Sequence, residues 1–252
     1  MANVKHIGKK ACVIGGSGFM ASLLIKQLLQ KGYAVNTTVR DPVIPKKCQL
    51  LLLQRLGKLK IFGADLTVEE DFNAPLSGSQ LVFLFATPNF SSEDPEGYPA
   101  SKALAKKAAW KFAEENGIDL ITVIPTLTIG PSITLDIPTS VGLATSLITG
   151  SISITHVEDI CRAHIFVAEK ESASGRYIVC AHNTSVPELA GFLSQRYPQY
   201  KIQSEFDDIA YKTKLAISSE KLIKEGFSFK YGIEEIFYQT VEYLRSKGAL
   251  KN

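Results

Sequence analysis

The chain has 252 residues, of which 45 % are hydrophobic and 21 % are charged. These proportions are those of an ordinary folded domain, and they exclude a disordered or fibrous protein. The 28 basic and 25 acidic residues leave a net charge of +3, which is too small to favour a nucleic-acid or membrane-surface partner.

Cysteine usage and apolar runs exclude further classes of protein. The N-terminal stretch MANVKHIGKK lacks the apolar core of a signal peptide, and no apolar run approaches the ~18 residues that a membrane helix requires. We therefore expect a cytoplasmic protein without membrane insertion, and the sequence leaves its oligomeric state open. The four cysteines form no CxxC pair, so reduced thiols are favoured over a zinc site or disulfides: Cys12, Cys48, Cys161 and Cys180.

The first forty residues predict the fold class. The apolar run Lys10–Ile14 stops at a glycine cluster, as a buried strand would, and Phe19–Lys31 then has apolar residues at helical spacing. Tyr33–Val39 is rich in β-branched residues and is predicted to be a second strand. A strand, a helix and a strand in this order form a βαβ unit, which implies an α/β fold with a parallel sheet.

Strands and helices continue to alternate along the rest of the chain. The apolar segment Leu81–Ala86 is typical of a central parallel strand that is covered on both faces. It is followed by TPNFSSEDPEGY, an unusually short link without a predicted strand. The other predicted elements are helices over Leu51–Leu56 and Ser101–Asn116, strands over Leu59–Phe62, Leu120–Ile124 and Arg176–Ala181, and a turn plus helix over Ile154–Glu169.

The glycine cluster has the spacing GxxGxxA of a dinucleotide-binding turn. Gly15 permits a tight turn, Gly18 lets the backbone approach a pyrophosphate, and Ala21 is small enough for close packing of helix and strand. The N-terminus of the helix then offers N–H groups and partial positive charge to the phosphates. The flanking strands and helix favour this interpretation over a glycine turn without a ligand.

The end of the second strand indicates which nucleotide binds. An NAD site usually has an acidic residue there, whereas this sequence has Arg40, whose guanidinium suits a 2′-phosphate. NADPH is therefore the predicted cofactor, and the alternative for Arg40 is a surface ion pair with Asp41. Asp65 and Leu66 follow the third strand and are candidates for contact with the adenine, and the alternative for Asp65 is to cap the next helix.

Tyr98 and Lys102 form a YxxxK pair at the start of a predicted helix. Residues four apart lie on one helical face, so the lysine ammonium can lower the pKa of the phenol, which is about 10 when unperturbed. The phenol can then donate a proton while a nicotinamide supplies hydride. The alternative is a half-buried tyrosine near an exposed lysine.

Several segments together resemble a known family. The motifs GGSGFMA, VRDP, ADLT, YPASK, PTLTIGPS and HVEDICRAHIFV resemble the extended short-chain dehydrogenase/reductases. Longer stretches such as KGYAVNTTVRDP and WKFAEENGIDLITVIPTL resemble the plant dihydroflavonol-reductase group, with the anthocyanidin reductases nearest. The resemblance implies NADPH-dependent reduction of a small flavonoid, namely an anthocyanidin, to a flavan-3-ol.

The resemblance also implies an architecture and a set of site residues. It implies a Rossmann-type doubly wound sheet over residues 1–124 with a return at about 151–181, and a smaller substrate-binding subdomain over 125–150 and 182–252. Tyr98 would be the acid, and Lys102 would tune it and hold the nicotinamide ribose. The residues along the cofactor would be Gly15, Gly18, Phe19, Met20, Ala21, Arg40, Asp65, Leu66, Ala86, Thr87, Tyr98, Lys102, Pro125 and Thr126.

The sequence departs from the family in one large stretch. Relatives insert a helix, a fifth strand and a long loop before YPASK, and a serine on that strand binds the substrate oxygen. Ser91, Ser92 and Ser101 are not in that context, so none is assigned the role. A second, shorter stretch is absent after Gly150. One βα unit of the sheet is therefore predicted to be missing.

The missing unit has structural and catalytic consequences. Either the Leu120–Ile124 strand moves beside Leu81–Ala86 or the sheet has a gap. Misplacing Tyr98 by about 1 Å costs about a hundredfold in rate, and losing a donor to the substrate oxygen costs about another 10²–10³. We therefore predict an impaired reductase. The alternatives are an inactive NADP-binding pseudoenzyme, dihydroflavonol or cinnamoyl-type reduction, or a natural polypeptide with residues that this sequence lacks.

The segment HVEDICRAH allows a metal site on spacing, with His156, Glu158, Asp159 and His164 as ligands. A capped helix start is favoured over that reading. Thr155 or His156 would be the cap, and the two acidic residues would suit the first turn. The sequence therefore predicts no metal.

Overall fold

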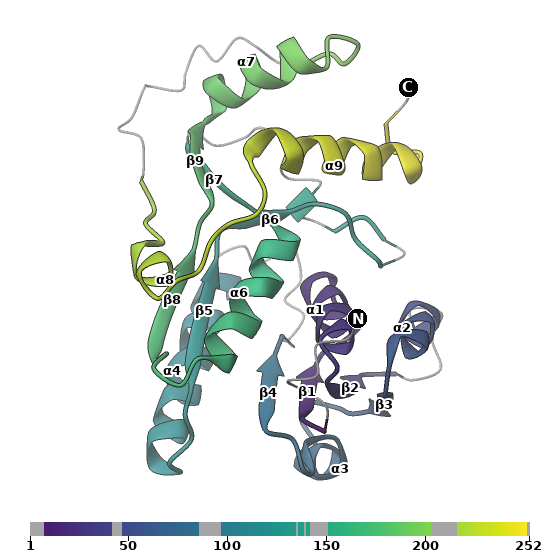
Figure 1. The fold of residues 1–252 in the computed structure, drawn as a ribbon, viewed down its shortest axis with the longest axis vertical. Helices are drawn as coiled ribbons and strands as arrows, with labels where there is room; N and C mark the ends of the chain where they lie inside the picture. The colour runs from purple at the N-terminus through teal and green to yellow at the C-terminus, as the bar shows by residue number, and fades with distance from the viewer. Residues whose placement is uncertain are drawn as a thin grey trace. The chain divides into compact units, whose positions relative to one another are not determined.

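The computed structural model describes residues 8–41, 47–85, 97–134, 136–138, 140–141, 151–202 and 216–250, with 47–48, 97–102 and 151 described through the backbone alone (Figure 1). The chain divides into two compact units. Unit 1 comprises Met1–Thr122 and Val167–Arg176, and unit 2 comprises Val123–Phe166 and Tyr177–Asn252.

Unit 1 contains a parallel four-stranded sheet in the order β3-β2-β1-β4. Its buried centre is formed by apolar residues of β1 and α1, including Cys12, Leu24 and Leu28. The order confirms the predicted Rossmann-type topology. The elements of unit 1 are β1 (Lys10–Ile14), α1 (Phe19–Gln30), β2 (Ala34–Val39), α2 (Lys47–Leu53), η2 (Gln54–Leu56), β3 (Leu59–Gly63), η3 (Glu69–Phe72), α3 (Asn73–Leu76), β4 (Leu81–Leu84) and α4 (Gly97–Glu115).

The βαβ prediction is confirmed with small shifts at its ends. Strand β1 has the predicted bounds, α1 ends one residue earlier and β2 begins one residue later than predicted. Residue 31 lies beyond the helix, and Gly32 follows with a positive φ of 91°. Such a left-handed residue ends a helix readily, so the sequence pattern and the backbone agree here.

Strand β4 differs from its prediction. Phe83 is buried, but the side chains of Val82 and Leu84 are 52 % and 64 % exposed, whereas both faces were expected to be covered. The physical reason is position, because β4 pairs with β1 and lies at the edge of its sheet in the part of the chain that the structure describes. Strand β5 (Ile121–Pro125) pairs with β8 (Gly175–Val179) instead. Among the described residues, β4 and β5 thus belong to separate sheets, and a strand beside β4 stays a prediction.

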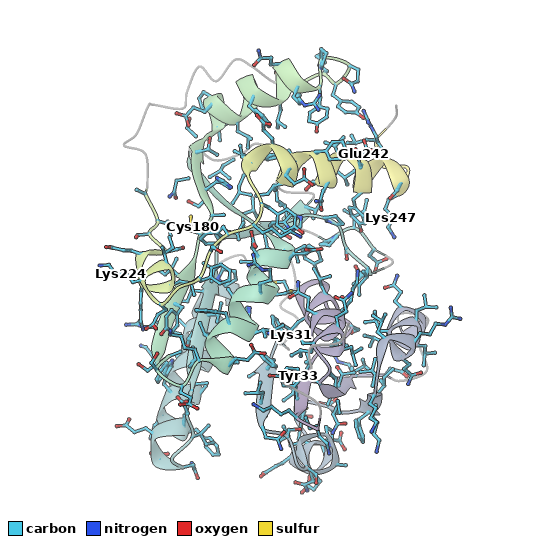
Figure 2. The ribbon with its side chains drawn as sticks, in the orientation of Figure 1. Lys31, Tyr33, Cys180, Lys224, Glu242 and Lys247 are labelled. Carbon is cyan, nitrogen blue, oxygen red and sulfur yellow. The ribbon has the colours of Figure 1, made fainter. Side chains whose placement is uncertain are left out.

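Glu169, the last residue of α6 (Val157–Glu169), binds two side chains that lie just before β2. Within unit 1, Lys31 Nζ lies 2.7 Å from Glu169 Oε2, and Tyr33 Oη donates to Glu169 Oε1 at 3.0 Å; Figure 2 labels both partners of this carboxylate. Burial and the adjacent carboxylate raise the pKa of Tyr33. The returning segment of unit 1 is thus fixed by a charge-assisted pair of contacts.

We expect the Glu169→Gln variant to unfold about 1 kcal/mol more easily, because both contacts lose their charge while the shape is kept. Urea denaturation followed by circular dichroism measures this change. Glu171→Gln is the matched control, since that glutamate is exposed two residues away. Equal stability of the two variants would contradict the role of Glu169.

Unit 2 contains a three-stranded sheet in the order β6-β7-β9, in which β6 and β7 are parallel and β9 is antiparallel. One prediction is wrong, because Ile154–His156 belongs to a strand rather than a turn. Strand β6 was not predicted. The remaining elements are β6 (Leu127–Ile129), β7 (Ser151–His156), β9 (His182–Ser185), α7 (Val186–Arg196), α8 (Glu220–Lys224) and α9 (Ile233–Ser246).

The start of α6 holds the segment before α9 in place. The Asp159 carboxylate is fully buried, accepts the backbone N–H groups of Lys230 and Tyr231 at 3.0–3.1 Å, and pairs with Arg162 at 2.5 Å. His156 stacks on Tyr231 at 3.9 Å, and its Nδ1 accepts the backbone N–H of Glu158 at 3.2 Å. His156 therefore caps the helix, as predicted.

The described residues contain no group of three or more His, Cys, Asp and Glu side chains arranged to hold a metal ion. In the same parts of the chain, none of the helices combines the length and the hydropathy needed to span a membrane.

Two histidines of unit 2 make stability depend on pH. Burial lowers the pKa of His164 to about 4, although its side chain is not completely shielded from solvent. Burial also lowers the pKa of the fully buried His156 more than the neighbouring Glu158 and Asp159 raise it. Each folded-state pKa thus lies below the unfolded value of about 6.5. Below about pH 6.5, these two histidines therefore bind more protons in the unfolded chain than in the folded chain.

We expect stability from these histidines to be complete above about pH 6.5 and to fall as the pH drops towards 4, with His164 alone contributing about 3 kcal/mol of the loss. Urea unfolding at a series of pH values measures the slope, and the His164→Asn variant isolates one contribution because carboxylates titrate equally in both proteins. If His164→Asn showed the same dependence of unfolding free energy on pH as the wild type, the role of His164 would be contradicted.

Candidate cofactor site and active-site helix

The glycine turn after β1 is fixed against the end of β2. Gly15 has a φ of 85°, a left-handed conformation that glycine adopts without strain. Its N–H donates to Thr38 Oγ1 at 3.2 Å, and the Gly16 N–H donates to the Thr38 carbonyl at 2.9 Å. The turn then closes with a bond from the Gly18 N–H to the Gly15 carbonyl at 3.1 Å. Strand β2 therefore sets the path of the turn.

Gly16 is a structural residue that sequence reasoning missed. A Cβ added there would lie 1.9 Å from Thr37 Oγ1 and 2.9 Å from Ile25 Cδ1. The turn thus touches the side chains of β2 and α1 directly. The only available sequence signal was the doubled glycine, because the contact itself is between residues far apart in the chain.

The N-terminus of α1 suits an anionic group. Gly18 is its N-cap, no side chain caps it, and its first turn has no acidic residue. Phe19 and Met20 are partly exposed, whereas Ala21 is 1 % exposed and packed inside. Because the helix dipole and the first N–H groups attract negative charge, these residues fit a pyrophosphate.

Arg40 and Asp65 lie at the carboxyl ends of β2 and β3, and both are exposed. Asp65 Oδ1 accepts the backbone N–H of Thr67 at 2.9 Å and its hydroxyl at 2.7 Å. These bonds, together with the charge of Arg40, lower the pKa of Asp65. Asp65 thus holds a turn instead of capping η3, and it stays ionised near Arg40. Leu66 beside it is 47 % exposed.

Tyr98 and Lys102 both lie in α4, which begins at Gly97, four residues earlier than predicted. Their spacing of four positions within one helix is as expected, and their side chains lie outside the described residues. Ala86 and Thr87 also lie outside the described residues.

Pro125 ends β5, and Thr126 follows it in unit 2. The Thr126 N–H donates to the Val179 carbonyl at 3.1 Å, and its hydroxyl lies 2.8 Å from the Thr155 hydroxyl. The Thr155 hydroxyl also donates to the Val179 carbonyl at 3.2 Å. This segment is therefore fixed to both β7 and β8.

No family model matches the chain. An anthocyanidin reductase ((2S)-flavan-3-ol-forming) from Vitis vinifera is 54 % identical over 338 aligned positions, covering 100 % of both chains. The chain belongs to the anthocyanidin reductase family. The anthocyanidin reductase of Arabidopsis thaliana is 46 % identical over 98 % of both chains, and a dihydroflavonol 4-reductase of the same plant is 34 % identical over 95 % of this chain and 83 % of its own.

Solved structures agree with the fold of this anthocyanidin reductase family member. Vestitone reductase from alfalfa superposes with a TM-score of 0.85 at 29 % identity, covering 96 % of this chain and 99 % of its own. Gre2 from Candida albicans, in a complex with NADPH, has a TM-score of 0.73 at 20 % identity, with coverage of 96 % and 100 %. The predicted resemblance, the oxidoreductase class and the Rossmann-type fold are thus confirmed.

The comparison also bears on the missing segment. The alignment with the Vitis vinifera anthocyanidin reductase has 338 positions and this chain has 252 residues, a difference of 86. Both proteins are covered from end to end, so the additional residues of the relative are internal. This agrees with a shortened sheet.

Proposed function

We propose that the chain catalyses NADPH-dependent reduction of an anthocyanidin to a flavan-3-ol. The observation that carries the proposal is the 54 % identity to an anthocyanidin reductase along the whole chain, against 34 % to a dihydroflavonol 4-reductase. The same identity disfavours an inactive pseudoenzyme. The turn at Gly15 and the uncapped N-terminus of α1 support a dinucleotide, and Arg40 at the end of β2 supports its 2′-phosphate.

In this proposal, each part of the site has a separate task. The N-terminus of α1 binds the pyrophosphate, with Gly15, Gly18, Phe19, Met20 and Ala21 around it. Arg40 binds the 2′-phosphate, and Asp65 and Leu66 lie beside the adenine. Ala86, Thr87, Pro125 and Thr126 lie along the rest of the nucleotide.

The proposed chemistry requires one proton donor in the chain. An anthocyanidin cation becomes a neutral flavan-3-ol by gaining two hydrides and one proton, so two NADPH molecules would bind in turn and each would supply one hydride. Tyr98 donates a proton to the flavonoid from its phenol, and Lys102, one helical turn further along α4, lowers the pKa of that phenol and holds the ribose. We propose that residues 1–124 and about 151–181 form the cofactor-binding part, which Pro125 and Thr126 extend, and that 125–150 and 182–252 form the smaller substrate-binding part. Location in the cytoplasm remains a prediction.

The experiment mixes the pure protein with NADPH and either cyanidin or dihydroquercetin, and it follows cofactor absorbance and chromatographic products. We expect flavan-3-ol from cyanidin at a slow rate, because this sequence lacks the strand whose serine is expected to bind the substrate oxygen in relatives. Turnover of dihydroquercetin alone would replace the proposal with dihydroflavonol reduction. Cofactor binding without any product would favour the pseudoenzyme.

Arg40→Ala should weaken NADPH binding by about 10–100-fold, the value of a charge-assisted contact of about 1.5–3 kcal/mol, and leave NADH binding unchanged. Fluorescence titration with both nucleotides measures this. Arg55→Ala is the control, because Arg55 is exposed and lies before the amino end of β3, whereas Arg40 follows the carboxyl end of β2. A preserved preference for NADPH in Arg40→Ala would remove Arg40 from the site.

A further inference from the structure

Strand β4 is the last strand of the four-stranded sheet in the part of the chain that the structure describes. One side of its backbone pairs with β1, in a register that runs from Ala11–Leu81 to Ile14–Leu84. Among the described residues, no strand pairs with its other side. An edge strand presents a row of N–H and C=O groups that another chain can use for pairing. This edge therefore has the backbone groups that pairing with another strand requires.

The same strand also has an open apolar face. Val82 and Leu84 point to one face because side chains alternate along a strand, and they are 52 % and 64 % exposed, whereas Phe83 between them is 6 % exposed. In a doubly wound sheet, helices cover both faces of an inner strand. Among the described residues, β4 thus has both an unpaired edge and two exposed apolar side chains on one face.

Nothing in the sequence of this edge opposes pairing with an identical strand. The segment QLVFLF over residues 80–85 contains no charge, no proline and no glycine. Natural edge strands are usually protected by lysine, proline or a bulge. Two copies of this segment would meet without charge repulsion, and both would bury apolar side chains.

We propose that β4 pairs with β4 of a second copy of this chain, antiparallel, about a two-fold axis normal to the sheet. Pairing centred on Phe83 places Val82 of each copy opposite Leu84 of the other, because a two-fold interface repeats every contact. Apolar cross-strand pairs of this kind stabilise a sheet. The two four-stranded sheets then continue as one, and the dimer is weak because the interface is small.

Sedimentation velocity over a range of concentrations tests the proposal with wild type, Leu84→Lys and Leu104→Lys. Leu104 lies on α4 and is 65 % exposed, so it matches Leu84 in residue type and exposure. We expect a dimer that dissociates on dilution, at least tenfold weaker in Leu84→Lys and unchanged in Leu104→Lys. A wild type that stays monomeric at every concentration, or equal weakening in both variants, would overturn the proposal. Circular dichroism checks that each variant is folded.

A cross-linking experiment keeps the test independent of the lysine variants. Val82→Cys and Leu84→Cys proteins are mixed under mild oxidation, and peptide mass spectrometry identifies the disulfides. We expect the mixed 82–84 disulfide to exceed either symmetric disulfide, because 82 and 84 face each other in the proposed register. Absence of the mixed disulfide would overturn the antiparallel pairing centred on Phe83.

Discussion

The Gly16→Ala variant should lose about 2–5 kcal/mol of folding free energy, through overpacking and a disturbed buried hydrogen bond. The added Cβ would lie 1.9 Å from Thr37 Oγ1 and 2.9 Å from Ile25 Cδ1. Thr37 cannot turn away freely, because it is fully buried and its hydroxyl donates to the Val13 carbonyl at 2.7 Å. Urea denaturation followed by circular dichroism measures the loss.

Gly18→Ala is the matched control for this prediction. Its added Cβ would lie 3.4 Å from the Gly15 carbonyl, and its φ of −74° suits alanine. We expect its stability to change by less than about 0.5 kcal/mol, as at an open site. NADPH affinity should nevertheless fall at least tenfold, because the methyl group would occupy the proposed path of the pyrophosphate. Equal destabilisation by both substitutions would contradict the packing argument.

Tyr98→Phe should lower the turnover of anthocyanidin by about 10²–10⁴, the range for a lost general acid. NADPH binding should stay within twofold of wild type, because the substitution removes only the phenolic hydroxyl. Steady-state kinetics and fluorescence titration measure the two effects separately. Tyr238→Phe is the control, since Tyr238 is 49 % exposed on α9. Full activity in Tyr98→Phe would remove the proposed acid.

Local patterns predicted much of unit 1. The strand at Lys10–Ile14, the glycine turn and the α1 helix follow from residues close together in the chain, so periodicity and turn chemistry were sufficient. Leu81–Ala86 shows the limit of such reasoning. Its composition is that of a buried strand, but burial depends on neighbouring elements, and no further strand pairs with β4 in the described parts of the chain.

Contacts between distant residues explain the remaining differences. Gly16 is fixed by Thr37 on another strand, and Asp159 is fixed by backbone groups more than 70 positions away. The sequence around Asp159 was consistent with a helix start and gave no sign of that partner. The residues proposed to hold the nucleotide were therefore easier to predict than the contacts that support them.

The central claim is that a phosphorylated nicotinamide held by unit 1 transfers hydride to a flavonoid. Its most direct test uses NADPH with deuterium at one or the other C4 position, together with cyanidin, and measures the label in the flavan-3-ol by mass spectrometry. We predict a deuterated product from one labelled form and an unlabelled product from the other. A product that is unlabelled with both forms, or no product while NADPH binds, would contradict the claim.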